Sequence, residues 1–222
     1  MLTSRLDRIV SYVNSDVCAD IGTDHAYASV EIIRQERAKK VIASDVREGP
    51  LKAAEGNIKR HRMESVIETR LGGGLSVLRP NEADTAVIAG MGGEMIIKII
   101  SEDMDIARNL TLILQPMNAQ YELRKFLISE GFTIEHEDIE TEGHRVYNIL
   151  IVKNGTMMPF KSEIEYHLPK YLSDNPKFDA LYDKKHREFK KIINGLRLSS
   201  DTDCEKLHYY EEMLRQMEAM TV

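Results

Sequence analysis

The sequence has few of the features that mark exported, membrane-bound or metal-dependent proteins. Only two of the 222 residues are cysteine, Cys18 and Cys204, and no metal-ligand spacing surrounds them. Two lone thiols indicate a reduced, cytoplasmic protein with no structural metal. No apolar run approaches the roughly 20 residues that cross a bilayer, so we expect neither export nor a membrane anchor.

Several common catalytic signatures are also missing. The sequence contains no GxxxxGK[ST] phosphate loop, no GxSxG elbow and no HExxH zinc helix. The formal net charge of -6 argues against binding nucleic acid by bulk attraction. Lysine and arginine nevertheless cluster twice, in residues 59–62 and 184–191. With 42% hydrophobic and 30% charged residues, the composition is that of a globular protein.

Short apolar segments rich in valine and isoleucine alternate with amphipathic segments along the first 130 residues. An amphipathic helix is expected at 4–13, before the first strand. Strands alternating with helices predict a parallel sheet with right-handed crossovers. The expected strands are residues 17–21, 41–44, 67–71, 85–89 and 110–114, and the expected helices are 26–36, 49–62, 93–101 and 119–130.

Two further strands, 132–139 and 145–152, are separated by only five residues, Glu140 to His144. This is too few for a helical crossover, so the two strands should pair antiparallel. The resulting α/β domain, with a seven-stranded and mostly parallel sheet, is expected to span residues 1–155. Prolines and glycines then interrupt the periodic pattern, as in a linker. Helical spacing from Phe178 onward, broken at 199–202, predicts a coiled-coil-like helical hairpin within a second part, 156–222.

The strongest functional signal is the segment Ala19-Asp20-Ile21-Gly22-Thr23-Asp24-His25-Ala26-Tyr27, at the end of the first expected strand. Ligands of open α/β sheets bind at this edge, and Gly22 lets a cofactor approach the backbone closely. Free amides at the helix start near Ala26 can donate to a carboxylate. The alternative is a purely structural turn in which Asp24 caps the helix.

Asp45 ends the second expected strand, 25 positions after Asp20. A carboxylate at that place can accept both hydroxyl protons of an adenosine ribose. Alternatively, it only complements the dipole of the next helix. Glycines follow the third strand at 72–74 and the fourth at 89–93, where backbone can lie close to a flat ring. These loops are weak signals singly, but all of them fall on one rim of the sheet.

Gln115 and Asn118 follow the fifth strand, in Leu114-Gln115-Pro116-Met117-Asn118. Their polar groups could hold an incoming base by its edge. A proline turn with Asn118 as a helix cap is an equally good interpretation.

Together these residues resemble the bacterial TrmK family, the tRNA (adenine-22) methyltransferases that make 1-methyladenosine. The resemblance rests on Ser4-Arg5-Leu6, Ala19 to Tyr27, Gly90 to Gly93, Leu114 to Pro116 and the helical hairpin, and it covers essentially the whole chain. In the first motif Asp24 and Ala26 replace two glycines of the general methyltransferase pattern, which is itself a family feature. The resemblance implies a Rossmann-like class I methyltransferase fold, S-adenosylmethionine as cofactor and tRNA as substrate, gripped in part by the hairpin.

The resemblance also implies roles for individual residues. Those expected to contact the cofactor are Asp20, Gly22, Thr23, Asp24, His25 and Ala26 at the methionine half, Asp45 and Val46 at the ribose, Gly72 and Gly73 at the adenine, and Ala89, Gly90, Met91, Gly92 and Gly93 at the mouth. For catalysis we expect Asp24 to stabilise the positive charge that develops on the base, with Gln115 or Asn118 as positioning groups.

The target nitrogen faces pairing or tertiary contacts inside tRNA, so the base must be everted at a cost of about a few kcal/mol. Contacts with the RNA backbone must offset this free-energy cost. The residues expected to supply these contacts are Lys184, Lys185, Arg187, Lys190 and Lys191. The alternative is a solvated outer face of a coiled coil.

Other functions left open are a methyltransferase of small molecules or proteins with the hairpin as a dimerisation arm, and a silent nucleotide-binding module. We expect a monomer or weak dimer.

Overall fold

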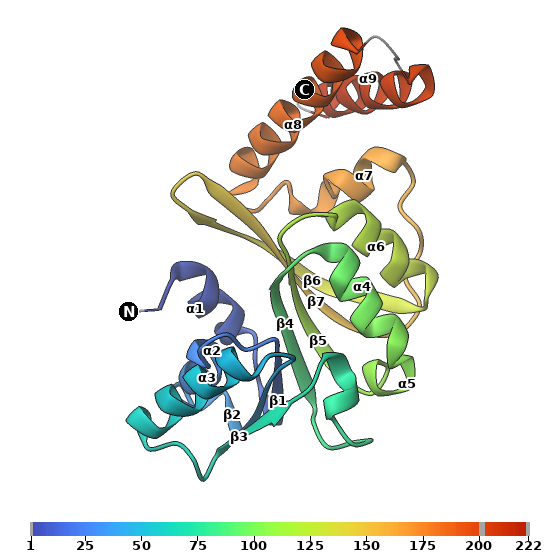
Figure 1. Ribbon diagram of the computed structural model, residues 1–222. Helices are drawn as coiled ribbons and strands as arrows, with labels where there is room; N and C mark the ends of the chain where they lie inside the picture. Colours follow the sequence, from blue (N-terminus) through green and yellow to red (C-terminus); the bar gives the residue numbers. More distant parts are fainter. Residues whose placement is uncertain (1, 200–202, 221–222) are drawn as a thin grey trace. The chain divides into compact units, whose positions relative to one another are not determined.

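The computed structural model describes residues 2–199 and 203–220, which fall into two compact units, Met1–Met158 and Pro159–Val222. The first unit ends three residues after the boundary expected from the sequence. Of the expected helix break at 199–202, residues 200–202 lie outside the described part of the chain. Each unit is considered by itself below (Figure 1).

The first unit is built on a seven-stranded sheet in the order β3-β2-β1-β4-β5-β7-β6. Strands β1 to β5 run parallel, and β7 pairs antiparallel with both β5 and β6. The predicted parallel sheet with an antiparallel terminal hairpin is therefore confirmed. The strands are β1 Ser15–Ile21, β2 Ala38–Asp45, β3 Ile67–Leu71, β4 Thr85–Met91, β5 Thr111–Pro116, β6 Phe132–Glu142 and β7 Arg145–Asn154.

Helices cover both faces of this sheet, because successive side chains of a strand point to opposite sides. Val87 and Ile113 pack under α1 (Ser4–Ser11), α2 (Tyr27–Arg34) and α3 (Glu48–His61). Their neighbours Ile88 and Leu114 pack under the helices of the other face (Figure 1). Those are α4 Gly93–Glu102, α5 Met104–Ala107 and α6 Gln120–Ser129, with the 3-10 turn η1 Gly74–Val77.

A buried ion pair holds α6 to the sheet. Arg124 on α6 donates to the carboxylate of Glu137 on β6, and the two side chains are 1% and 0% exposed. Nδ2 of Asn148, on β7, donates to the same carboxylate at 2.9 Å. Because an uncompensated buried charge is costly, this contact ties α6 to the β6-β7 hairpin.

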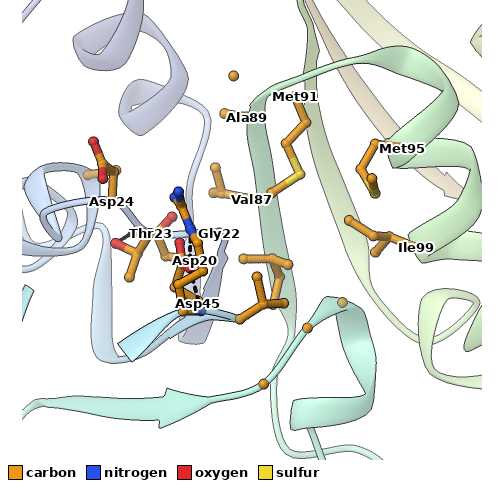
Figure 2. A pocket seen from close by; sticks show the side chains of 18 of the residues that line it. Asp20, Gly22, Thr23, Asp24, Asp45, Val87, Ala89, Met91, Met95 and Ile99 are labelled. Atoms are coloured by element: carbon orange, nitrogen blue, oxygen red, sulfur yellow. Dashed lines mark hydrogen bonds and ion pairs between the residues drawn. The ribbon is translucent and has the colours of Figure 1, made fainter. Parts of the chain in front are cut away.

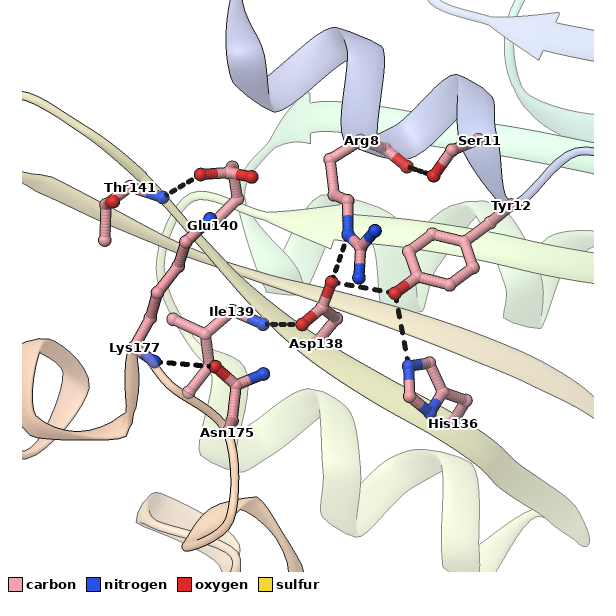
Figure 3. A network of polar contacts seen from close by, with 10 residues as sticks. All are labelled: Arg8, Ser11, Tyr12, His136, Asp138, Ile139, Glu140, Thr141, Asn175 and Lys177. Carbon is pink, nitrogen blue, oxygen red and sulfur yellow. Dashed lines mark hydrogen bonds and ion pairs between the residues drawn. The ribbon is translucent and has the colours of Figure 1, made fainter.

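A second polar network holds α1 against β6 (Figure 3). Nε of Arg8 and the hydroxyl of Tyr12 both donate to Oδ2 of Asp138, the hydroxyl at 2.7 Å. The hydroxyl of Tyr12 also lies 3.1 Å from Nε2 of His136. Burial and the bond to Asp138 raise the pKa of Tyr12, and the same carboxylate raises the pKa of Arg8. The amino-terminal helix is therefore fixed to an edge strand far from it in sequence.

The loop between β3 and β4 is closed by a bidentate ion pair. Nη1 and Nη2 of Arg70 each donate to the Glu82 carboxylate at 2.7 Å. These bonds, together with the Arg79 amide, lower the pKa of Glu82 from 4.5 to about 2. A carboxylate whose pKa is depressed by folding stabilises the protein above its unfolded pKa, and this contribution disappears as the pH falls through the folded pKa.

Replacing Glu82 by glutamine is therefore expected to lower the melting temperature at pH 7, with a deficit that shrinks as the pH falls from about 4.5 toward 2. Thermal unfolding followed by circular dichroism across this range measures the deficit. Glu64→Gln, at an exposed position, is the matched control and should leave the melting temperature unchanged at every pH. A deficit of the same size at both ends of this pH range would contradict the ionic origin of the stabilisation.

The second unit is helical. It contains α7 Glu163–His167, the 3-10 turn η2 Lys170–Leu172, α8 Phe178–Leu198 and α9 Cys204–Ala219. Helices α8 and α9 pack against each other and bury Phe189, Ile193, Met213 and Met217. The ion pair of Arg197 with Glu211, at 2.6 Å, also joins them. The expected helical hairpin is confirmed. Within the described residues, no helix combines the length and apolarity needed to span a membrane.

Candidate active site

A cavity of about 870 Å³ opens where β1, β2 and β4 end. Acidic side chains from β1 and β2 face methionine side chains from β4 and α4 across it (Figure 2). Most of the residues expected to contact a cofactor line this cavity. They are Asp20, Gly22, Thr23, Asp24, His25, Asp45, Val46, Gly72, Gly73, Ala89, Gly90 and Met91.

The turn after β1 is held by a buried carboxylate. Oδ2 of Asp20 accepts from the hydroxyls of Thr23, at 2.9 Å, and Ser29, at 2.5 Å. Burial raises the pKa of Asp20, and the bonds from Ser29 and Thr23 oppose that rise. Asp20 therefore fixes the loop that leads into α2.

Gly22 passes the cavity in a left-handed conformation, with φ of 78°. A Cβ built on Gly22 would lie 2.1 Å from Cε of Met91. The amides of Gly22 and Thr23 both donate to the carbonyl of Ser44, at 2.8 and 2.7 Å. The backbone of this turn thus lines the cavity at Gly22 and Thr23.

Asp24 is not a helix cap, so that alternative is wrong. The residue at the cap position of α2 is Ala26, whose φ is 52° and which makes no side-chain cap hydrogen bond. The side chain of Asp24 is 73% exposed and lies 3.6 Å from Nε2 of His25. The carboxylate therefore stands at the mouth of the cavity, while the side chain of Ala26 is fully buried and does not line it.

Asp45 ends β2 and is 5% exposed. Its Oδ1 accepts from the amide of Arg47 at 2.8 Å and lies 3.5 Å from Nε of the same residue. Oδ2 makes no hydrogen bond or ion pair within the described residues. Gly73 lines the cavity next to Val46. A Cβ at Gly73 would lie 2.6 Å from Cγ1 of Val46, so the absence of a side chain keeps this part of the cavity open.

The end of β4 turns sharply into α4. The register with β5 shifts between Ala89 and Met91, and Gly90 has φ of 76°. Gly92 and Gly93, expected at the mouth, are not among the residues that line the cavity. A Cβ on Gly93 would lie 2.5 Å from the carbonyl of Ala119, so this glycine allows α4 to pack closely on the loop after β5.

Gln115 and Asn118 are also not among the residues that line the cavity. Gln115 is fully buried, and its Oε1 accepts from Nη1 of Arg5 at 2.5 Å and from the amide of Gly90 at 3.2 Å. Oδ1 of Asn118 accepts from the amide of Gly93 at 3.2 Å, and Asn118 is not the cap of α6, which is Ala119. Both side chains hold the glycine loop. Gln115 is buried and so is placed to position this loop rather than to touch a base, whereas Asn118 is exposed.

For the other residues of the cavity the sequence predicted no contact. From α4 it is lined by Met95, Lys98, Ile99 and Glu102, at helical spacing. The sequence predicted a helix at 93–101, and this spacing puts all four side chains on one helix face. The remaining lining residues, some of them inside the motifs noted above but without a predicted contact, are Arg5, Leu6, Ile21, Tyr27, Ala28, Arg47, Gly74 and Val87.

The basic cluster expected to contact RNA lies on α8, and its members are not equivalent. Lys185 is 5% exposed and pairs with Glu188 at 3.0 Å. Burial lowers the pKa of Lys184. Arg187, Lys190 and Lys191 are exposed. The alternative of a wholly solvated face therefore does not hold for Lys185. Arg187, Lys190 and Lys191 present the basic surface, with Lys190 and Lys191 three and four residues after Arg187.

The part of the chain that the structure describes contains no group of three histidine, cysteine, aspartate or glutamate residues that could hold a metal ion.

Comparison with known proteins agrees with this geometry. A family model described as a methyltransferase domain matches residues 2–150. The tRNA (adenine(22)-N(1))-methyltransferase of Bacillus subtilis is 34% identical over 156 residues, which are 69% of this chain and 66% of that enzyme.

Solved structures match over the whole chain, among them these two. The crystal structure of the m1A22 tRNA methyltransferase TrmK of B. subtilis has a TM-score of 0.89 and 26% identity, and covers 100% of this chain and 99% of that one. A Streptococcus pneumoniae protein, described as a candidate tRNA (m1A22) methyltransferase and crystallised with S-adenosyl-L-methionine, has a TM-score of 0.87, 28% identity and full coverage of both chains.

Proposed function

Because the chain belongs to the methyltransferase-domain family, and within it to the bacterial TrmK family, we propose that it methylates tRNA. The reaction is transfer of a methyl group from S-adenosylmethionine to ring nitrogen 1 of adenine 22, giving 1-methyladenosine. The observation that carries the proposal is the glycine-walled cavity at the ends of β1, β2 and β4, with Asp45 at one side and the exposed Asp24 carboxylate at its mouth.

The residues present fit S-adenosylmethionine. The volume of about 870 Å³ is within the range of small-molecule sites. Asp45 offers a carboxylate oxygen to ribose hydroxyls, and the missing side chains of Gly22 and Gly73 leave room that a Cβ would fill. Asp45 and Val46 would hold the ribose, Gly72 and Gly73 the adenine, and the turn from Asp20 to His25 the methionine half. When bound, the cofactor supplies a methyl group on a positively charged sulfur.

The chain's own contribution is positioning more than acid-base chemistry. Ring nitrogen 1 of adenine has a free lone pair and needs no prior deprotonation, so alignment of the reacting atoms carries most of the rate. Gln115 and Asn118 hold the amides of Gly90 and Gly93 in place at 3.2 Å and so fix the loop at the mouth. The Asp24 carboxylate faces the exocyclic amine of the base and stabilises the positive charge that methylation creates.

Binding of tRNA is expected to involve Arg187, Lys190 and Lys191. Replacing all three by glutamine should weaken tRNA binding and lower the slope of log K against log salt by about one for each phosphate that is no longer bound. Affinity for S-adenosylmethionine should not change. Filter binding at a series of salt concentrations, with calorimetry for the cofactor, measures both.

A triple glutamine variant at Arg37, Lys39 and Lys40 is the matched control, because it removes equal charge from the start of β2. It should keep the salt slope of the unaltered protein. An unchanged salt slope in the α8 variant would show that Arg187, Lys190 and Lys191 do not contact the RNA.

We further propose that the reaction takes place in the cytoplasm, with the protein acting as a monomer or weak dimer. The free thiols of Cys18 and Cys204 and the tRNA substrate of the relatives support the cytoplasmic part of this proposal. Analytical ultracentrifugation tests the oligomeric state directly.

The proposed function is tested by incubating the protein with labelled S-adenosylmethionine and unmodified bacterial tRNA, then digesting the RNA to nucleosides. We expect label in 1-methyladenosine. Label in no nucleoside, with cofactor binding intact, would overturn the tRNA assignment and favour a small-molecule or protein substrate.

A further inference from the structure

Arg5 is brought into the cavity from α1, far in sequence from the other residues that line it. Its Nη1 donates to Oε1 of the buried Gln115 at 2.5 Å, across 110 positions of the chain. The guanidinium lies 5.4 Å from the ring centre of Tyr147, and Gly90 is the neighbouring cavity residue, since a Cβ there would lie 3.6 Å from Nη1. Arg5 therefore sits where β4 and β5 end.

Within the described residues, Arg5 is the one lysine or arginine of the cavity lining that makes no ion pair. Among the lysines and arginines that line it, Arg47 lies 3.5 Å from the Asp45 carboxylate and Lys98 lies 3.7 Å from Glu102. The Arg5 guanidinium makes no ion pair within the described residues, and its one hydrogen-bond partner there is a neutral amide. Nε and Nη2 thus keep donors that a planar oxyanion fits well.

Arg5 is held in this place before any ligand arrives. Its own backbone amide donates to Oε1 of Glu142 at 2.7 Å. Further along the chain, Arg8 on α1 and Tyr12 at the end of this helix bind Asp138 on β6, as Figure 3 shows. A cation fixed by its helix, by Gln115 and by the Tyr147 ring loses little entropy on binding an anion.

We propose that Arg5 binds an oxyanion of a reactant inside the cavity. The inference rests on the proposed function, whose reactants bring two such groups: the carboxylate of the cofactor's methionine half, and the backbone phosphate beside the target adenine. In either case Arg5 orients a reactant, and Gln115 is a positioning residue that acts through Arg5.

The test compares Arg5→Gln with the unaltered protein in calorimetric titrations with S-adenosylmethionine and with 5′-methylthioadenosine, which lacks the carboxylate, and in filter binding with tRNA. A charge-assisted hydrogen bond accounts for a loss of about tenfold or more. A tenfold loss for S-adenosylmethionine with methylthioadenosine unchanged identifies the carboxylate. A tenfold loss for tRNA with both small molecules unchanged identifies the phosphate.

A second variant tests the same idea without removing Arg5. Gln115→Glu keeps an acceptor of the same shape but gives Arg5 an internal anion, so it should weaken the same ligand as Arg5→Gln does. Arg34→Gln, an exposed arginine on α2 paired with Glu31, controls for general loss of charge and should change nothing.

Affinities within twofold for all three ligands in Arg5→Gln would overturn the proposal. So would an equal loss for S-adenosylmethionine and methylthioadenosine, because that pattern reports a distorted cavity rather than a missing partner for the anion. The two small-molecule titrations need no methyl transfer. Failure of the proposed tRNA activity in the unaltered protein therefore remains distinguishable from failure of this inference.

Discussion

Asp45→Asn is expected to weaken S-adenosylmethionine binding by roughly 10- to 100-fold. Asp45 is 5% exposed, and the Arg47 amide already occupies one side of its Oδ1. Asparagine keeps the shape but replaces one acceptor oxygen with a donor nitrogen, so one ribose hydroxyl loses its partner and both lose the charge. Hydrogen bonds to charged groups contribute about 1.5–3 kcal/mol, which gives this range.

Calorimetric titration with S-adenosylmethionine measures the effect. Asp16→Asn is the matched control, because Asp16 is an exposed carboxylate near the start of β1 that pairs only with Lys39 among the described residues. It should bind the cofactor normally. Undiminished affinity of Asp45→Asn for S-adenosylmethionine would mean that the ribose binds elsewhere in the cavity.

Arg124→Met is expected to lower the free energy of unfolding by about 3–5 kcal/mol, the usual result of removing one partner from a buried ion pair. The variant would remove the cation from the Glu137 carboxylate, which is 0% exposed and also accepts from the Asn148 amide. Since α6 follows the loop that carries Asn118, this loss should loosen the wall behind the active site as well.

Urea denaturation of Arg124→Met measures the loss, and the double variant Arg124→Met, Glu137→Leu separates its causes. Replacing both charges by apolar side chains of similar volume is often close to neutral, so the double variant should recover most of the stability. A double variant as unstable as Arg124→Met alone would mean that packing around Arg124, not the loss of its charge beside Glu137, sets the cost.

Much of the fold follows from the periodicity of the sequence. The strands at Val17–Ile21 and Thr85–Ala89 were predictable because parallel strands, buried on both faces, appear as continuous apolar runs. The short connection between Phe132–Ile139 and Arg145–Val152 was enough to predict their antiparallel pairing. The helix at Met104–Ala107 was not predictable, because four residues carry no measurable period.

The candidate site was predictable where a local turn carries it and not where distant segments meet. Gly22 and Asp45 could be predicted as site residues because each lies at the end of an expected strand. Arg5 does not, because its contact with Gln115 depends on how α1 docks on β6. For the same reason the burial of Gln115 could not be foreseen, and a base-edge contact by its amide does not match its placement.

The cluster on α8 shows a further limit. The run Lys184-Lys185-His186-Arg187 appears uniformly basic in sequence, but a helix turns about 100° at each residue and separates neighbours onto different faces. Lys185 is thereby directed into a buried position beside Glu188, whereas Arg187 stays exposed.

The most direct test of the central claim uses two unmodified tRNA transcripts that differ only at position 22, one with adenine and one with guanine. After incubation with S-adenosylmethionine and the protein, reverse transcription locates the modified base, because a methyl on nitrogen 1 blocks pairing. We predict a stop next to position 22 in the adenine transcript and none in the guanine transcript. Equal methylation of both transcripts, or of neither, would contradict the account.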